Sequence, residues 1–209
     1  MIKKQTVPAG DFKVWLDRTR DALIKDEGND VPCGSCTACC TSSYFIHIRP
    51  EEKKTLASIP KQVLFPAPGM PKGNYVMGYN EKGHCPMFKD NKCSIYENRP
   101  QTCRSYDCRV FYATGLPAGD KRKALINQQV ERWRFKFNGT DAGELYNIIR
   151  KTARFLVENK KKFPKDVIPS NTTQLAILAI RIYPFFTKEK DTINDSDKID
   201  QIRNFLADQ

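Results

Sequence analysis

Four of the chain's eight cysteines stand within eight residues, at Cys33, Cys36, Cys39 and Cys40. Thiolates two residues apart in a short loop can turn toward one point, so C-x2-C is the usual chelating unit for Zn²⁺. The triple spacing C-x2-C-x2-C also recurs where a loop wraps an iron–sulfur cubane. The other four cysteines follow at Cys85, Cys93, Cys103 and Cys108. This pattern predicts a metal centre with the rest of the chain as its scaffold.

The compartment decides how the cysteines are interpreted. The N-terminus has no apolar run typical of a secretory signal, and the longest apolar run, Leu175 to Ile180, is far too short to span a bilayer. We therefore expect a cytoplasmic protein with no membrane segment, where disulfides rarely persist but metal-held thiolates do. Two alternatives stay open: four disulfides in a secreted protein, or one or two ordinary buried thiols within a metal-binding set.

The hydrophobic pattern of the 209 residues predicts an α+β fold. In the first half we expect a helix over 9–26, strands over 44–48 and 75–79, a short helix over 50–58, loop over 60–73, a β-hairpin over 85–96 and a helix opened by Pro100. In the second half we expect helices over 120–135, 141–161 and 172–183 and a short terminal helix around Ile199. The predicted domains are a small irregular cysteine-cluster domain over 1–112, N-terminal helix included, packed on a basic α-helical region over 113–209.

Three sequence features together carry a family resemblance. They are the quadruple cysteine of residues 33–40, the approach Gly83-His84-Cys85-Pro86, and the run Cys93-Ser94-Ile95-Tyr96 continuing through Arg99-Pro100 to Cys103-Arg104. Over residues 30–112 the chain resembles the YkgJ-like CxxCxxCC family, a zinc- or iron-chelating cysteine-cluster domain. The resemblance implies that all eight cysteines are metal ligands. Flagellin lysine N-methylases carry a similar cysteine motif, but this chain shows no glycine-rich cofactor motif for methyl transfer.

The identity of the centre is left open by the sequence. Successive side chains of an extended segment point to opposite sides, so we do not expect Cys39 and Cys40 to serve one mononuclear ion. Either two neighbouring sites or one polynuclear site follows. Both Zn²⁺ and an iron–sulfur cluster, most simply 4Fe-4S, fit the spacing.

Basic groups are expected near a cluster of negative thiolates. Arg99 and Arg104 are the candidates, with the alternative that Arg99 pairs with Glu97 or Asp107 and holds the turn at Pro100. His84 could replace a thiolate as ligand, although eight cysteines leave little need for it. We expect His47 to be an ordinary half-buried residue.

The second half of the chain is strongly basic, with thirteen Lys and Arg against four Asp and Glu over residues 121–165. Arg132 and Arg134 are interleaved with aromatics, as in surfaces that bind nucleic acid. An acidic protein partner and a plain solvated face are alternatives, and nucleic acid is not favoured. No Walker, G-x-S-x-G or H-E-x-x-H motif is present, so no catalytic residue is predicted. The leading function is a structural, electron-transfer or metal-delivery centre; the rivals are a metal-dependent protein-modifying enzyme and a nucleic-acid-binding zinc protein.

Overall fold

The computed structural model describes residues 5–29, 31–187 and 193–207. Its short strands and many helices confirm the α+β class, and the C-terminal half is helical as predicted. The chain divides into two compact units that interleave along the sequence. The cysteine-bearing unit comprises residues 21–107 and 120–129, and the helical unit comprises residues 1–20, 108–119 and 130–209. The predicted domain boundary at residue 112 stays a prediction.

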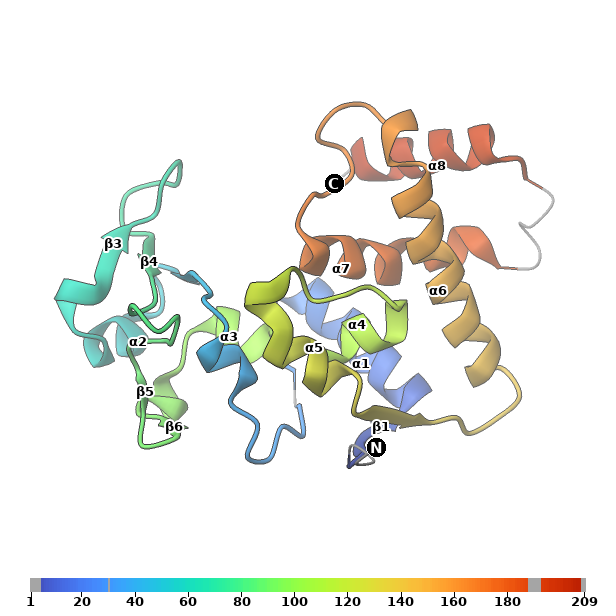
Figure 1. The fold of residues 1–209 in the computed structure, drawn as a ribbon. Coiled ribbons are helices and arrows are strands. Elements are labelled where there is room, and N and C mark those ends of the chain that lie inside the picture. Colours follow the sequence, from blue (N-terminus) through green and yellow to red (C-terminus); the bar gives the residue numbers. More distant parts are fainter. Residues whose placement is uncertain (1–4, 30, 188–192, 208–209) are drawn as a thin grey trace. The chain divides into compact units, whose positions relative to one another are not determined.

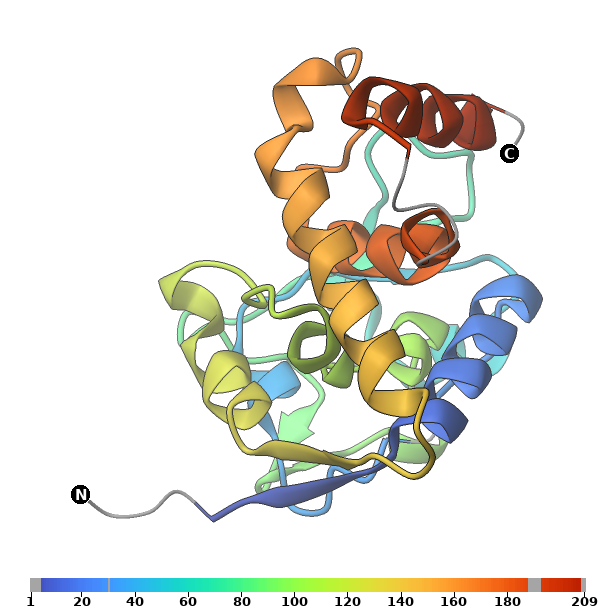
Figure 2. The ribbon, with the colours of Figure 1, turned by 90° about the vertical axis from the view of Figure 1, so that its right-hand side faces the viewer.

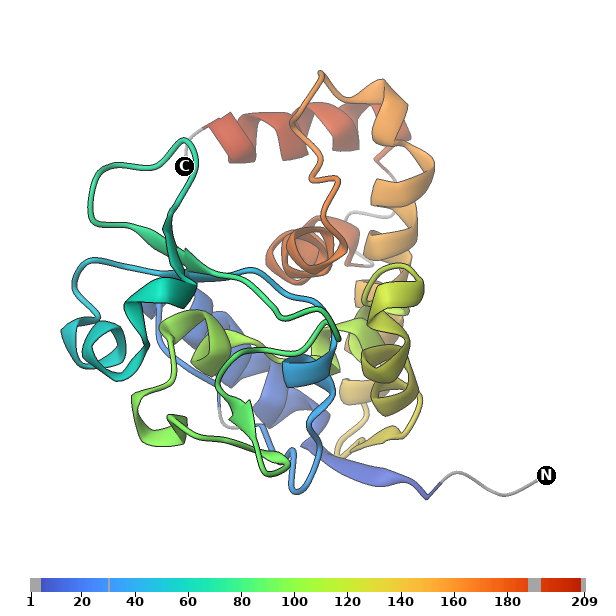
Figure 3. The same cartoon turned by 60° about the vertical axis from the view of Figure 1, so that its left-hand side comes forward.

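The cysteine-bearing unit is built from very short elements joined by long loops, seen from the side in Figure 3. Its elements are η1 (Ala38–Thr41), β2 (Ile46–Ile48), α2 (Lys53–Ser58), η2 (Lys61–Val63), β3 (Leu64–Pro66), β4 (Tyr75–Met77), β5 (Phe88–Lys89), β6 (Lys92–Cys93), η3 (Tyr96–Asn98), α3 (Gln101–Ser105), η4 (Lys121–Lys123) and α5 (Ala124–Val130). Strands β2, β4 and β3 form an antiparallel sheet in that order, with β4 in the centre.

A small hydrophobic core lies in the cysteine-bearing unit beside this sheet. The buried side chains of this core are Ile48, Ile59, Met77 and Met87, with Cys85 packed against them. A core of this size buries little apolar area to offset the entropy lost on folding. The unit therefore has the composition of a small domain that needs a further source of stability, such as a metal ion.

Strands β5 and β6 form the predicted hairpin, with Phe88 opposite Cys93. Asp90 and Asn91 have φ values of +49° and +58°. Positive φ at both central residues is typical of a two-residue type I′ turn, and Asp and Asn tolerate that conformation better than most residues. The hairpin thus follows from local turn chemistry, which is why the sequence predicted it.

The helical unit contains β1 (Val7–Asp11), most of α1 (Phe12–Lys25), α4 (Arg109–Thr114), β7 (Trp133–Lys136), α6 (Ala142–Glu158), η5 (Lys160–Lys162), α7 (Thr172–Ile182), η6 (Tyr183–Phe186) and α8 (Asp195–Ala207). Helices α4, α6 and α7 pack against one another (Figure 1). Their buried apolar residues form a large core that includes Phe155, Leu156, Ile182 and Phe186. Helix α7 begins cleanly because the Asn171 side chain accepts hydrogen bonds from the backbone N–H groups of Thr173 and Gln174.

A two-stranded parallel sheet joins the first strand of the helical unit to a distant segment. Strand β1 pairs with β7, from Val7 opposite Trp133 to Asp11 opposite Lys136, and Figure 2 shows the two strands side by side. In β7, Trp133 and Phe135 are buried while Arg134 and Lys136 are exposed. This alternation has the period of a strand.

Several boundaries differ from the predictions. The helix expected over 120–135 is wrong in its second part, because α5 ends at Val130 and β7 follows. The loop expected over 60–73 contains the short strand β3. The predicted helices over 141–161 and 172–183 are confirmed as α6 and α7. However, Asp141 does not cap α6 with its side chain, which instead pairs with Lys13 at 2.6 Å.

Candidate metal centre

The first four cysteines lie on a turn-rich loop that ends in the 3₁₀ turn η1. The backbone N–H of Cys36 donates to the carbonyl of Cys33 at 3.0 Å, with Gly34 at φ +55° between them. The N–H of Cys40 donates to the carbonyl of Thr37 at 2.9 Å. These local bonds define a tightly wound loop, as the C-x2-C spacing predicts.

Backbone hydrogen bonds bring this loop to the segment that carries Cys85. The N–H of Cys85 donates to the carbonyl of Cys40 at 2.7 Å, and the N–H of Ser43 donates to the carbonyl of Gly83 at 2.8 Å. Two cysteines separated by 44 intervening residues thus become neighbours. Neither bond could be read from local sequence pattern.

The turn at Cys85 directs backbone N–H groups at its sulfur. Burial raises the pKa of Cys85, while the backbone N–H groups of Met87 and Phe88 act against that rise by hydrogen bonding. Backbone N–H donors directed at a sulfur favour its charged form. This arrangement suits a sulfur that is to be deprotonated by a metal ion.

Cys40 and Cys103 are drawn into the same group. Burial, followed by the thiols of Cys85, Cys93, Cys36 and Cys33, raises the pKa of Cys40 to about 12. Burial, followed by the thiols of Cys85, Cys40 and Cys93, likewise raises the pKa of Cys103 to about 12.

Four thiols are therefore mutual neighbours, and we call them the inner thiols: Cys40, Cys85, Cys93 and Cys103. Each of the six pairs within this set interacts electrostatically. All four are partly buried and come from four different segments: η1, the loop before β5, β6 and α3. Four thiolates are the complete ligand set of a structural zinc site.

The other thiols of the loop differ from the inner thiols in exposure and surroundings. Cys33 and Cys39 are exposed, and Cys36 is half-buried. Cys39 interacts with the ammonium group of Lys123. Cys39 and Cys40 both lie on a 3₁₀ turn and not on the extended segment expected from the sequence. That they do not serve one mononuclear ion stays a prediction.

Cys108 belongs to the helical unit, whereas the other seven cysteines belong to the cysteine-bearing unit. It is buried, and the indole N–H of Trp133 donates to its sulfur at 3.2 Å. Its assignment as a metal ligand stays a prediction. Its surroundings also fit the alternative that one cysteine is an ordinary buried thiol.

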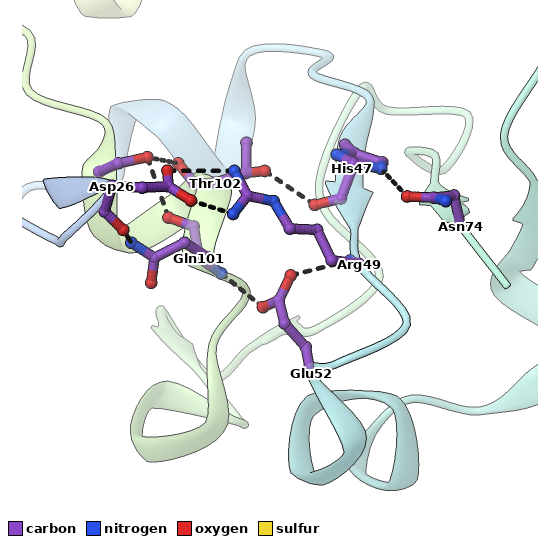
Figure 4. A network of polar contacts seen from close by, with 8 residues as sticks. Asp26, His47, Arg49, Glu52, Asn74, Gln101 and Thr102 are labelled. Atoms are coloured by element: carbon purple, nitrogen blue, oxygen red, sulfur yellow. Dashed lines mark hydrogen bonds and ion pairs between the residues drawn. The ribbon is translucent and has the colours of Figure 1, made fainter. Parts of the chain in front are cut away.

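A polar network, drawn in Figure 4, fixes the helix that carries Cys103. The guanidinium of Arg49 pairs with both carboxylate oxygens of Asp26, which lowers the pKa of Asp26. The side-chain amide of Gln101, the first residue of α3, donates to the carbonyl of Asp26 at 3.0 Å. The start of α3 is thereby tied to the end of α1.

The same network continues to strand β2. One carboxylate oxygen of Glu52 accepts the backbone N–H of Gln101 at 2.6 Å and the other accepts the N–H of Arg49 at 2.9 Å. The hydroxyl of Thr102 donates to the carbonyl of His47 at 2.8 Å (Figure 4). Because Gln101 and Thr102 directly precede Cys103 in sequence, the network sets the position of its thiol. Neither Gln101 nor Thr102 was singled out from the sequence.

The two arginines predicted to lie near the thiolates have different positions. Arg99 stacks over the ring of Tyr96 at 4.0 Å and its charge opposes the rise in the pKa of Cys103. Arg104 donates instead to the backbone carbonyls of Glu97 and Arg99. Arg99 also donates to the carbonyl of Tyr96 at 3.0 Å, so both arginines hold the turn before Pro100. The structure places Arg99 near one thiol, while its role toward a metal stays a prediction.

Arg104 also meets the chain that leads into the cysteine loop. The backbone N–H of Asn29 donates to the carbonyl of Arg104 at 2.9 Å. A Cβ at Gly28 would lie 3.0 Å from the Cβ of Arg104, so only glycine fits here without displacement. This close approach fixes where the loop starts relative to α3.

Lys123 is a cationic neighbour of the loop that the sequence did not reveal. Its ammonium group donates to the carbonyls of Ser42 and Ser43 and lies 3.4 Å from the centre of the Tyr44 ring. Burial and then Arg122 lower the pKa of Lys123, while Asp120 and Cys39 oppose that change. In the sequence, Lys123 is marked only by the basic run Lys121-Arg122-Lys123, and such a run also fits a solvent-exposed face.

The contacts of the two histidines are with residues other than the inner thiols. His47 is half-buried, as expected, and its Nε2 lies 2.9 Å from Oδ1 of Asn74 (Figure 4). His84 is held by a backbone hydrogen bond to Oδ1 of Asn80 and its ring contacts Phe88 edge-on. His84 as a replacement ligand stays a prediction.

Arg132 and Arg134, the two arginines considered for nucleic-acid binding, donate hydrogen bonds to backbone carbonyls. Arg132 donates to the carbonyl of Gln5 at 2.9 Å, and Arg134 donates to the carbonyls of Glu131 and Trp133. Both side chains therefore bind backbone groups next to or within the β1–β7 pair. Protein and nucleic-acid partners stay predictions.

The inner thiols are close neighbours but do not stand as a formed coordination shell. Across the described ranges, no three Cys, His, Asp or Glu side chains are already placed to hold one ion. The donor set nevertheless fits a thiophilic metal, because the four half-buried thiols interact electrostatically and backbone N–H groups are directed at one of them. Binding would require a local rearrangement of these side chains and loss of their protons.

Comparisons with known proteins agree with this chemistry. No curated protein and no solved structure matches the chain. Among the described residues, no helix has both the length and the apolar character needed to cross a membrane. One family model matches, that of the CxxCxxCC family, described as a "putative zinc- or iron-chelating domain", over residues 32–130. This range extends past the predicted resemblance over 30–112 and takes in η4 and α5, which belong to the same compact unit as seven of the cysteines. Over residues 32–130 the chain is therefore similar to the CxxCxxCC family of zinc- or iron-chelating domains.

Proposed function

We propose that the four inner thiols, Cys40, Cys85, Cys93 and Cys103, hold one Zn²⁺ that serves as the structural core of the cysteine-bearing unit. The observation that carries this proposal is the mutual interaction of all four thiols, which come from four separate segments. A single ion bound by them would cross-link η1, the Cys85 loop, β6 and α3. Four thiolates complete the tetrahedral set of structural zinc and leave no position for a substrate.

The small core of the unit supports a structural role. With Ile48, Ile59, Met77 and Met87 as its buried hydrophobic cluster, the unit has little apolar burial to stabilise it. Metal binding to a site that does not persist in the unfolded chain adds directly to folding free energy. The ion would thus supply the stability that the core lacks.

The remaining thiols of the loop, Cys33, Cys36 and Cys39, would bind a second and more exchangeable metal. Cys33 and Cys39 are more exposed than the inner thiols, and Cys33 and Cys36 interact with Cys40. Three protein ligands leave an open coordination position, which suits exchange. This exchangeable metal is the one that the protein could deliver to another protein.

The test is metal analysis of the full chain purified without oxygen, together with serine variants at single cysteines. After treatment with a mild chelator, the wild type should keep about one zinc per chain and show no visible colour. Cys40→Ser, Cys85→Ser, Cys93→Ser and Cys103→Ser should each lose that ion. Cys108→Ser is the matched control, since Cys108 lies in the helical unit, and it should keep the ion.

Two outcomes would overturn the assignment. Iron with matching sulfide and a brown colour would replace zinc by an iron–sulfur cluster. Retention of zinc by all four inner variants would remove the inner thiols as its ligands. Loss of zinc from Cys108→Ser as well, with the helical unit still folded, would add Cys108 to the ligand set.

A further inference from the structure

Lys123 contacts the chain directly after η1, the turn that carries Cys39 and Cys40. It belongs to η4, which is far in sequence from the cysteine loop but in the same compact unit. Its ammonium group donates to the carbonyls of Ser42 and Ser43, the two residues after η1. Because η1 carries both Cys39 and Cys40, these bonds fix the end of the turn from which the two thiols diverge.

The ammonium group also has an aromatic support. It lies 3.4 Å from the centre of the Tyr44 ring, within the range of a cation–π interaction. The hydroxyl of Tyr44 lies 2.9 Å from that of Tyr106, and the two rings meet edge-on. Tyr106 directly follows α3, the helix of Cys103. Lys123, Tyr44 and Tyr106 thus connect η1 to α3 without using any thiol.

The charge of Lys123 matches its position. A thiolate centre carries net negative charge, and positive groups nearby stabilise it. The thiol that interacts with Lys123 is Cys39, which is not one of the inner thiols. Lys123 thus interacts with a thiol of η1 other than Cys40.

We propose that Lys123 is a positioning residue that locks η1, so that Cys40 is directed to the inner metal and Cys39 is held apart from it. The metal-binding part of this inference rests on the proposed function. Locking of η1 itself does not, because the contacts that produce it involve backbone carbonyls and tyrosines. The two parts can therefore be measured separately.

The variant Lys123→Met removes the ammonium group but keeps most of the aliphatic stem. The matched control is Lys121→Met, the same substitution in the same turn at an exposed side chain. Lys123→Arg keeps the charge and tests whether the charge alone maintains slow amide exchange and slow zinc release. Thermal unfolding of each variant shows whether it is folded before any comparison is made.

The first readout is amide hydrogen exchange of the metal-free protein over residues 38–44. Lys123→Met should exchange faster than wild type in this segment, while Lys121→Met should match wild type. Equal exchange in Lys123→Met and Lys121→Met would overturn the locking of η1. This readout needs no metal, so it holds even if the zinc assignment fails.

The second readout is the rate at which zinc passes from the loaded protein to a chelator. Lys123→Met should lose metal about 10- to 100-fold faster, the usual effect of removing a partner of a metal ligand. Lys123→Arg should lie nearer to wild type, and Lys121→Met should be unchanged. If wild type holds no metal, the proposed function fails. If wild type holds zinc and Lys123→Met releases it at the wild-type rate, the inference fails while the proposed function stands.

Discussion

Metal binding at the inner thiols should depend steeply on pH. Burial is the first cause of a raised thiol pKa at three of them: to about 12 for Cys40 and Cys103, and upward from 9.0 for Cys85. In the metal-free protein near neutral pH these three thiols are therefore protonated. A metal binds their thiolates, so each ion bound must release at least three protons.

The direction and the size of the change in zinc affinity with pH follow from these three protons. Protons compete with the metal, so lowering the pH favours the metal-free state and raising it favours the bound state. With three protons released, the apparent affinity for Zn²⁺ should rise about 1,000-fold from pH 6.5 to pH 7.5, or about 4 kcal/mol of binding free energy.

The assay is a chelator competition at several pH values, corrected for the chelator's own protonation, with proton release measured directly in a weakly buffered solution. Cys108→Ser, which should keep the ion, should release as many protons per ion as wild type, because Cys108 lies outside the inner thiols. A slope of one proton or fewer per zinc in wild type would refute the reasoning, since it would mean that the ligands are already ionised or are not these thiols.

Three further outcomes follow from the packing. Removing metal with a strong chelator should speed amide exchange in residues 38–105 and leave the α6–α7 core protected, because only the cysteine-bearing unit depends on the ion; uniform exchange in both units would contradict this. Gly115→Ala should cost about 1–3 kcal/mol of stability by denaturant unfolding, because Gly115 has φ +73° and a Cβ would lie 2.7 Å from the guanidinium of Arg150. Gly143→Ala, where a Cβ meets nothing within 4 Å, is the control and should be neutral or stabilising. Trp133→Phe should destabilise the helical unit by about 1–3 kcal/mol through the lost hydrogen bond to Cys108 and the cavity left behind; an unchanged unfolding midpoint would show that this contact carries no stability.

The elements that sequence predicts well are those set by local chemistry. Helices α6 and α7 have long periodic apolar patterns, and the β5–β6 hairpin has Asp90 and Asn91 at its turn. Each depends on residues within one or two turns of itself. The same holds for Pro100, which stands at the start of α3 as expected.

The elements that sequence misses depend on distant partners. Strand β7 reads as helix because its neighbours do, although Trp133 and Phe135 alternate with Arg134 and Lys136. Its partner β1 lies more than 120 residues earlier, and no local pattern indicates a parallel pair. Tertiary pairing thus overrides a weak local preference.

The candidate site shows the same division. The spacing of the loop cysteines predicts a metal-binding segment, and the matching family model, that of a "putative zinc- or iron-chelating domain", covers this segment. Sequence distance fails to group the thiols: Cys103 joins Cys40 and Cys85, while Cys108, five residues later, lies in the helical unit. Lys123 is missed for the same reason, because its contacts with Ser42 and Ser43 span about eighty residues.

The most direct test of the central claim is the zinc X-ray absorption spectrum of the full chain, taken after the exchangeable metal has been removed. Our account predicts a first shell of four sulfurs at about 2.3 Å, with no nitrogen or oxygen. A shell that contains nitrogen or oxygen ligands would contradict the inner thiol site, because Cys40, Cys85, Cys93 and Cys103 supply sulfur alone.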